Sequence, residues 1–156
     1  MRKRQIRVES LKAVAPTEWL DIKAIAQVEI SSEGAGNPIE SALTPDADGE
    51  WCAAEAGEQI IRLVFDTPQA IRRIHVMIEE RERFRTQEYI FRWSDNIGGP
   101  LREICRQQWN FSPAGSTREI ENHSVDLKNV AVLELSIRPD ISGGDARARL
   151  RELRIA

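Results

Sequence analysis

Apolar and polar residues alternate in short stretches along the chain, and this period of two residues predicts β-strands. Each stretch has the length of a strand and is bounded by Gly, Pro, Asn or Asp residues. In one of them, for example, Ile74, Val76 and Ile78 all fall on the same face. The clearest stretches are residues 24–30, 60–65, 71–78, 88–93, 130–137 and 150–155.

The rest of the chain predicts further strands and little helix. Residues 101–108 and 117–125 alternate less regularly and are also expected to be strands. The one expected helix covers residues 16–25, with Thr17 placed to cap it, and is two turns long at most. Many short strands without helical partners predict an all-β fold, an antiparallel two-sheet sandwich of the jelly-roll type. A closed barrel is the alternative.

The last predicted strand contains an irregularity. The apolar positions of residues 146–150 have one parity, and those of residues 153–155 have the other. A regular strand cannot turn both sets inward, because its side chains alternate with a period of two. One extra residue at 151–152 would bring both sets to the same face, as in a β-bulge. Such a bulge would aim Glu152 at a specific partner.

Composition narrows the class of protein. With 156 residues, of which 41% are hydrophobic and 30% charged, the chain is expected to form one domain over residues 1–156. Residues 1–23 are expected to be an N-terminal extension packed on that domain. The net charge of -3 argues against a nucleic-acid partner. No run has the roughly 20 apolar residues of a membrane helix, and no apolar run follows the basic start. We therefore expect a cytoplasmic protein without a membrane partner.

The residues that most often perform catalysis lie outside catalytic patterns. Cys52 and Cys105 are too far apart for a metal motif and are expected to be reduced thiols. His75 alternates within a predicted strand, and no nucleophile motif anchors His123. We therefore expect no catalytic residues and no enzyme.

The order of features from about residue 26 to residue 156 resembles the discoidin, or coagulation factor type C, family of galactose-binding-like sandwiches. A predicted strand ends in the pair Ser31-Ser32, as in the family. The resemblance continues through ALTPDADGEW (residues 42–51), GEQIIRLVFDTPQAIRRIHVMI (residues 57–78), YIFRWSDNIGG (residues 89–99) and the closing ELRI. It implies a discoidin-like β-sandwich that binds a ligand without catalysis. This fold serves sugar binding, phospholipid binding and protein docking alike.

The resemblance also implies a structural calcium between the Ala-Leu segment and the last strand. The matching residues are Asp46, which would supply its carbonyl, and Glu152, while Asp48 could replace a missing carboxylate. Thr44 and Gly49 stand where the family has an Asp and a Thr, which weakens the site because calcium needs six to eight oxygens. The alternative is that this segment is simply a turn. No other cofactor is expected.

Two aromatic residues at a predicted strand end suggest a ligand site. Trp109 and Phe111 precede the Ser-Pro-Ala-Gly turn, whereas Trp51 and Trp93 are expected in the core. A sugar site needs a flat apolar surface and a few fixed polar groups. The alternative is that both aromatic side chains close the end of the sandwich. The predicted ligand set is Arg85, Trp109, Asn110, Phe111, Arg138 and Asp140.

Two charged loops are further candidates. Residues 138–147 combine two glycines with both signs of charge, including Asp145 and Arg147. Residues 81–85 place arginines around Phe84, as in an anion or partner patch. The predicted function is carbohydrate binding, and the alternative is an intracellular protein-docking domain. A docking face should show a contiguous apolar patch of several hundred Å², whereas a sugar site should be a small cleft with polar walls.

Overall fold

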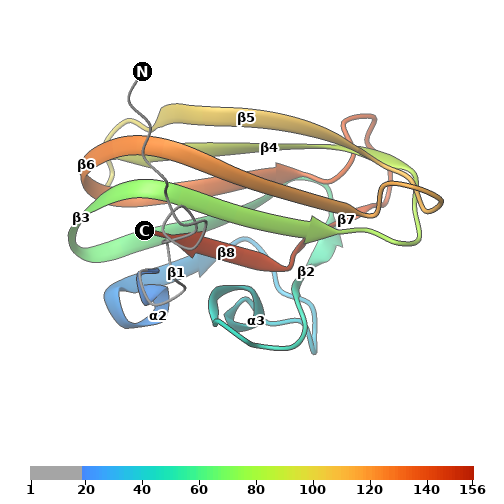
Figure 1. Cartoon of the computed structure of the whole chain (residues 1–156), viewed down its shortest axis with the longest axis horizontal. Coiled ribbons are helices and arrows are strands. Elements are labelled where there is room, and N and C mark those ends of the chain that lie inside the picture. The colour runs from blue at the N-terminus through green and yellow to red at the C-terminus, as the bar shows by residue number, and fades with distance from the viewer. Residues whose placement is uncertain (1–18) are drawn as a thin grey trace, which may run out of the picture.

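The alternating stretches form an antiparallel β-sandwich in the computed structural model, which describes residues 19–156 (Figure 1). The predicted fold class is therefore confirmed. The two helices within residues 19–156 are single turns, α2 (Ile22–Ile25) and α3 (Glu40–Leu43), and Figure 1 shows them on the same side of the sandwich. The strands are β1 (Ala26–Ile30), β2 (Trp51–Ala56), β3 (Gln59–Glu79), β4 (Arg85–Ser94), β5 (Arg102–Phe111), β6 (Arg118–Arg138), β7 (Arg147–Leu150) and β8 (Glu152–Ile155).

Two long strands build most of the sandwich. β3 and β6 each have 21 residues, and each joins two stretches that the sequence predicted as separate strands. The register between them shifts between Val64 and Arg73, where Pro68 cannot donate a ladder hydrogen bond. In β6, Asn129 has a positive φ of 58° in the same region. Both strands bend there, and Figure 1 shows each of them folding back over itself.

The bend places the two halves of each long strand in different layers. The first half of β3 pairs with β1 and with the second half of β6, which continues through β4 to β5. The second half of β3 pairs with the first half of β6 and with β8. β2 and β7 form a separate antiparallel pair.

Large apolar side chains fill the space between the layers. Trp51, Tyr89 and Phe91 are each fully buried, and Trp93 is half-buried against the core. The prediction that Trp51 belongs to the core is therefore confirmed. The face predicted for β3 is confirmed too, since Ile74 and Val76 have no exposed surface.

The irregularity in the last strand marks a change of sheet. β7 pairs with β2 as far as Leu150, and β8 then pairs with β3 from Glu152 onward. Between them, the backbone N–H of Arg151 donates to the carbonyl of Met77 at 2.8 Å. Leu150 and Leu153 are both buried, so the predicted change of parity is confirmed.

The helix near the start is shorter than predicted. α2 begins at Ile22 with Asp21 at its N-cap, and Asp21 makes no side-chain capping bond. Thr17, the predicted cap, lies outside the described residues, so the predicted N-terminal extension stays a prediction there. Among residues 19–156, no helix has the length and apolarity to cross a membrane.

Candidate functional site

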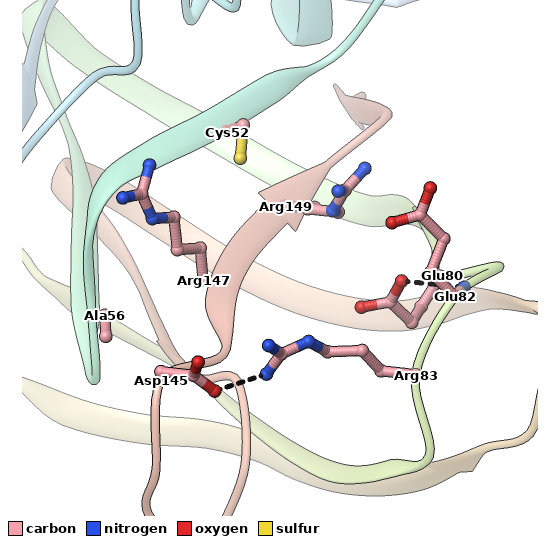
Figure 2. A pocket seen from close by; sticks show the side chains of 8 residues that line it. All are labelled: Cys52, Ala56, Glu80, Glu82, Arg83, Asp145, Arg147 and Arg149. Atoms are coloured by element: carbon pink, nitrogen blue, oxygen red, sulfur yellow. Dashed lines mark hydrogen bonds and ion pairs between the residues drawn. The ribbon is translucent and has the colours of Figure 1, made fainter.

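A polar depression of about 460 Å³ lies where β2 and β7 meet the loops after β3 and β6 (Figure 2). We call it the charged hollow. Three of its side chains are arginines and three are carboxylates. Its lining residues are Cys52, Ala56, Glu80, Glu82, Arg83, Asp145, Arg147 and Arg149.

The two charged loops of the sequence meet at this hollow. The guanidinium of Arg83 donates to Asp145 Oδ1 at 2.8 Å, which joins residues 80–84 to residues 139–146. The backbone N–H of Ile141 also donates to the carbonyl of Thr86 at 2.9 Å, at the start of β4. The two loops of the hollow are thus far apart in sequence, with a separation of 62 residues for the ion pair.

A buried ion pair forms part of the floor. Arg85 Nε donates to Glu80 Oε1 at 2.9 Å, and the exposed fractions of the two side chains are 0% and 4%. Arg85 also donates to Gln87 Oε1 at 3.0 Å and to the carbonyl of Pro139 at 2.7 Å. Burial opposes ionisation of Glu80, but the hydrogen bond from Arg85 lowers its pKa below the ordinary value. The charges of Arg85 and Glu80 therefore pair with each other inside the protein.

β7 supplies two guanidiniums to the wall of the hollow. Arg147 and Arg149 project from the same face of the strand, because Ala148 between them turns into the core. Arg149 lies opposite Cys52 in β2 and pairs with Glu50 at 2.6 Å. Arg147 lies opposite the small Ala56 and is exposed. In the part of the chain that the structure describes, the Arg147 side chain has no hydrogen-bond or ion-pair partner.

The thiol in the hollow is not an activated nucleophile. Burial raises the pKa of Cys52, although Arg149 acts in the opposite direction. Burial likewise raises the pKa of Cys105, to about 11. Both cysteines are free thiols and are protonated at neutral pH.

Two residues of the predicted ligand set are interior residues. Arg85 is buried, as described above, and its guanidinium lies 4.7 Å from the ring centroid of Phe111, which is 2% exposed. The two residues are directly opposite each other in the β4–β5 pair. Neither side chain is accessible to a ligand, which corrects their place in the predicted ligand set. The burial of Phe111 agrees with the alternative that it closes the end of the sandwich.

The other members of the set lie nearby on the surface. Asn110 is exposed and accepts a hydrogen bond from the Thr86 hydroxyl at 2.7 Å, and Trp109 is half-buried, with its indole N–H donating to Ser116 at 3.1 Å. Arg138 is exposed at the end of β6, and Asp140 accepts hydrogen bonds from Ser142 in its own loop. Their role in binding stays a prediction.

Sequence reasoning singled out the two loops of the hollow without placing them together. It noted Arg83 beside Phe84, and Asp145 beside Arg147, as separate charge clusters. The alternation of arginine with small residues in ARAR could have indicated a strand with one charged face. Phe84 is the most exposed large apolar side chain in the described chain, at 76%, and directly follows a lining residue.

The residues at the predicted calcium site do not fit that ion. Arg154 Nη1 donates to the carbonyl of Ala42 at 2.7 Å, and Nη2 donates to the carbonyl of Thr44 at 3.3 Å. The guanidinium of Arg154 therefore already binds the carbonyl oxygens of Ala42 and Thr44. A calcium ion at this place would need such oxygens as ligands. Glu152 Oε2 lies 3.0 Å from His75 Nε2 and is already paired.

Only two of the three acidic residues of that site lie in the same depression. Asp46 lies in a turn with a φ of 60° and lines the same small depression as Glu152, whereas Asp48 does not line it. Within residues 19–156, no three His, Cys, Asp or Glu side chains are grouped to hold a metal. The alternative interpretation of this segment as a turn fits the structure better.

A second depression, of about 590 Å³, lies over β1 and β3 beside the exposed Ile97. Its charged side chains pair with their neighbours across the strands. Arg62 lies 2.8 Å from Glu134 and 3.5 Å from Glu29. These charges are used within the sheet, so the charged hollow is the stronger candidate for a polar ligand.

Comparison with known proteins identifies the fold. No protein-family model and no curated protein matches this chain. A family 32 carbohydrate-binding module from Clostridium perfringens NanJ, solved in complex with galactose, is similar over 88% of this chain and 96% of its own, at 12% identity and a TM-score of 0.65. The CBM32-3 module from a family 31 glycoside hydrolase of Clostridium perfringens covers 97% of this chain and 98% of its own, at 14% identity and a TM-score of 0.66.

A pectin-binding carbohydrate-binding module is also similar, at 19% identity, a TM-score of 0.61, and coverage of 84% of this chain and 89% of its own. Similarity at this level of identity establishes the fold. This chain has the discoidin-like, galactose-binding-like sandwich. The prediction of that fold from the resemblance is confirmed.

Proposed function

We propose that this protein binds carbohydrate without catalysis, and that the charged hollow is the binding site. The hollow has polar walls and a volume of about 460 Å³, which suits one or two sugar rings. This combination of polar walls and small size is the observation on which the proposal rests. The solved modules of the same fold, described above, are carbohydrate-binding modules, which supports the same class of ligand.

The groups around the hollow suit the chemistry of a sugar. Sugar hydroxyls donate to carboxylates and accept from guanidiniums, and Glu82 and Arg147 present both kinds of group. The exposed ring of Phe84 directly follows the lining residue Arg83 in the chain but does not itself line the hollow.

The docking alternative has less support from the surface. A docking face would need a contiguous apolar patch. The described chain has five exposed large apolar residues, namely Phe84, Ile97, Leu101, Ile120 and Ile141, and of these Ile97 and Leu101 lie together on the second depression. The cytoplasmic location expected from the sequence stays a prediction.

A glycan array with matched variants tests the proposal. We expect the wild-type protein to bind a defined set of glycans, and Arg147→Ala to lose that binding while its melting curve stays unchanged. Trp109→Ala tests the other location, at the end of β5, and should retain binding if the hollow is the site. A folded wild-type protein that binds no glycan on a broad array would contradict the proposal. Binding lost in Trp109→Ala but kept in Arg147→Ala would move the site to the strand end.

A further inference from the structure

The pairing of charges within the hollow points to a particular class of sugar. Two of the three carboxylates are already used, since Asp145 pairs with Arg83 and Glu80 pairs with the buried Arg85. Arg149 is partly used, because its Nη1 donates to Glu50. The groups left for a ligand are the guanidinium of Arg147, the rest of Arg149 and the carboxylate of Glu82.

These free groups lie on opposite sides of the hollow. Figure 2 shows Arg147 on the side of β2, near Ala56, and Glu82 across the hollow beyond Arg149. Two residues apart on one strand face, the bases of the two arginine side chains are roughly 7 Å apart. One side therefore presents guanidiniums, and the other presents a hydrogen-bond acceptor.

We propose that the hollow binds a sugar that carries one carboxylate, such as a uronic acid, with the carboxylate on Arg147 and the ring hydroxyls donating to Glu82. This inference rests on the proposed function. A guanidinium is a planar fork that matches a carboxylate in two parallel hydrogen bonds, and Arg147 has no partner to give up first. The small side chain of Ala56 opposite Arg147 leaves that fork uncovered.

The net negative charge of the protein disfavours general binding of polyanions and so favours a sugar with a single charge. The chain carries a net charge of -3, so it has no excess of positive charge to attract any anionic polymer. Glu82 would also repel a second acidic group on the far side of the ring. A singly charged ring with free hydroxyls satisfies both sides, whereas a heavily sulfated ring does not.

Short matched oligosaccharides test the inference without the avidity of a polymer. Calorimetry would compare a trisaccharide of two galactose rings and one galacturonic acid ring with its carboxyl-reduced form, a galactose trisaccharide, and with a cationic glucosamine trisaccharide. We expect the acidic trisaccharide to bind at least about tenfold more tightly than the reduced form, the gain typical of a hydrogen bond between charged groups. Arg147→Gln should abolish that preference, and Arg147→Lys should restore only part of it, since an ammonium cannot form the fork.

The control variant is Arg72→Gln, which removes the same charge from an exposed position on β3 outside the hollow. It should keep the full preference for the acidic sugar. Equal binding of the acidic and neutral trisaccharides, or tighter binding of the glucosamine trisaccharide, overturns this inference and leaves carbohydrate binding intact. A preference that survives Arg147→Gln also overturns it. Binding of none of the three sugars, together with a blank glycan array, overturns the proposed function itself.

Discussion

Two arginines at opposite ends of the last part of the chain show what decides between a structural and a binding role. Arg147 begins β7, is exposed, and has no partner within the described residues. Arg154 lies in β8, is 9% exposed, and donates to the carbonyls of Ala42, Leu153 and Thr44. The sequence gives both the same charge, and their surroundings give them different uses.

The difference between them is a difference in unsatisfied hydrogen-bonding capacity. A buried guanidinium must have its donors satisfied inside the protein, because an unpaired buried charge costs several kcal/mol. Arg154 meets this need with backbone carbonyls and joins α3 to β8. Arg147 is exposed, so its donors are open to solvent and to a ligand.

The largest expected effect is on the free energy of unfolding, and it follows from removing the buried guanidinium of Arg154. Arg154→Met should lower the free energy of unfolding by about 3 kcal/mol, because it leaves the buried carbonyl of Ala42 without its donor and removes the bond to the partly buried carbonyl of Thr44. Arg147→Met should change it by no more than about 0.5 kcal/mol, as is usual for an exposed side chain. Urea unfolding measures both. Similar losses in the two variants would refute the comparison.

A second expected effect concerns a carboxyl in the buried polar group beneath the hollow. Glu119 is 1% exposed and accepts a hydrogen bond from Gln87, which in turn accepts one from Arg85. Burial, with Glu121 as a lesser cause, raises the pKa of Glu119 from 4.5 to about 7. The folded protein therefore holds the proton more tightly than the unfolded chain between these values, and stability falls as the pH rises through this range.

Glu119→Gln should remove that dependence. Relative to the variant, the wild-type protein should lose roughly 2 kcal/mol of unfolding free energy between about pH 4.5 and pH 7. Urea unfolding at a series of pH values, with the exposed carboxyl variant Glu55→Gln as control, measures the difference. Parallel pH profiles for wild type and Glu119→Gln would show that burial does not control this carboxyl.

The smallest expected effect concerns calcium. Because Arg154 already occupies the carbonyls between α3 and β8, a chelator should leave the melting midpoint of the wild-type protein unchanged. Added calcium should also have no effect. Scanning calorimetry in both conditions tests this, and a midpoint that rises with calcium would show that an ion binds here despite the guanidinium.

Much of the fold could be predicted because each strand carries its own alternating pattern. Residues 71–78 alternate cleanly, and their predicted inner face is the buried face. The change of parity after Leu150 was also readable, since buried side chains must return to the core whichever sheet holds them. The bends were not predictable. Residues 66–68 have the composition of a turn, but they lie within β3 because pairing with β6 continues on both sides.

The candidate site could be predicted only in pieces. The arginines of ARAR and the charged loop around Phe84 are visible in the sequence, but the Arg83–Asp145 contact joins residues 62 positions apart. The sequence predicts Arg85 in a surface loop, because it follows the charged run of residues 81–84, and leaves open whether Phe111 contacts a ligand or closes the end of the sandwich. Their burial depends on the β4–β5 register, which local composition does not specify.

Local alternation in the sequence predicts the strands and the inner faces of the regular ones, because a period of two and the cost of exposing apolar surface act locally along the chain. Only the tertiary contacts determine which charged side chains are paired within the protein and which stay free. An arginine can pair with a carboxylate, donate to backbone carbonyls or stay open to a ligand. Which of these it does depends on atoms brought from distant segments. The hydrogen-bonding capacity of each charged group is satisfied only where those segments meet.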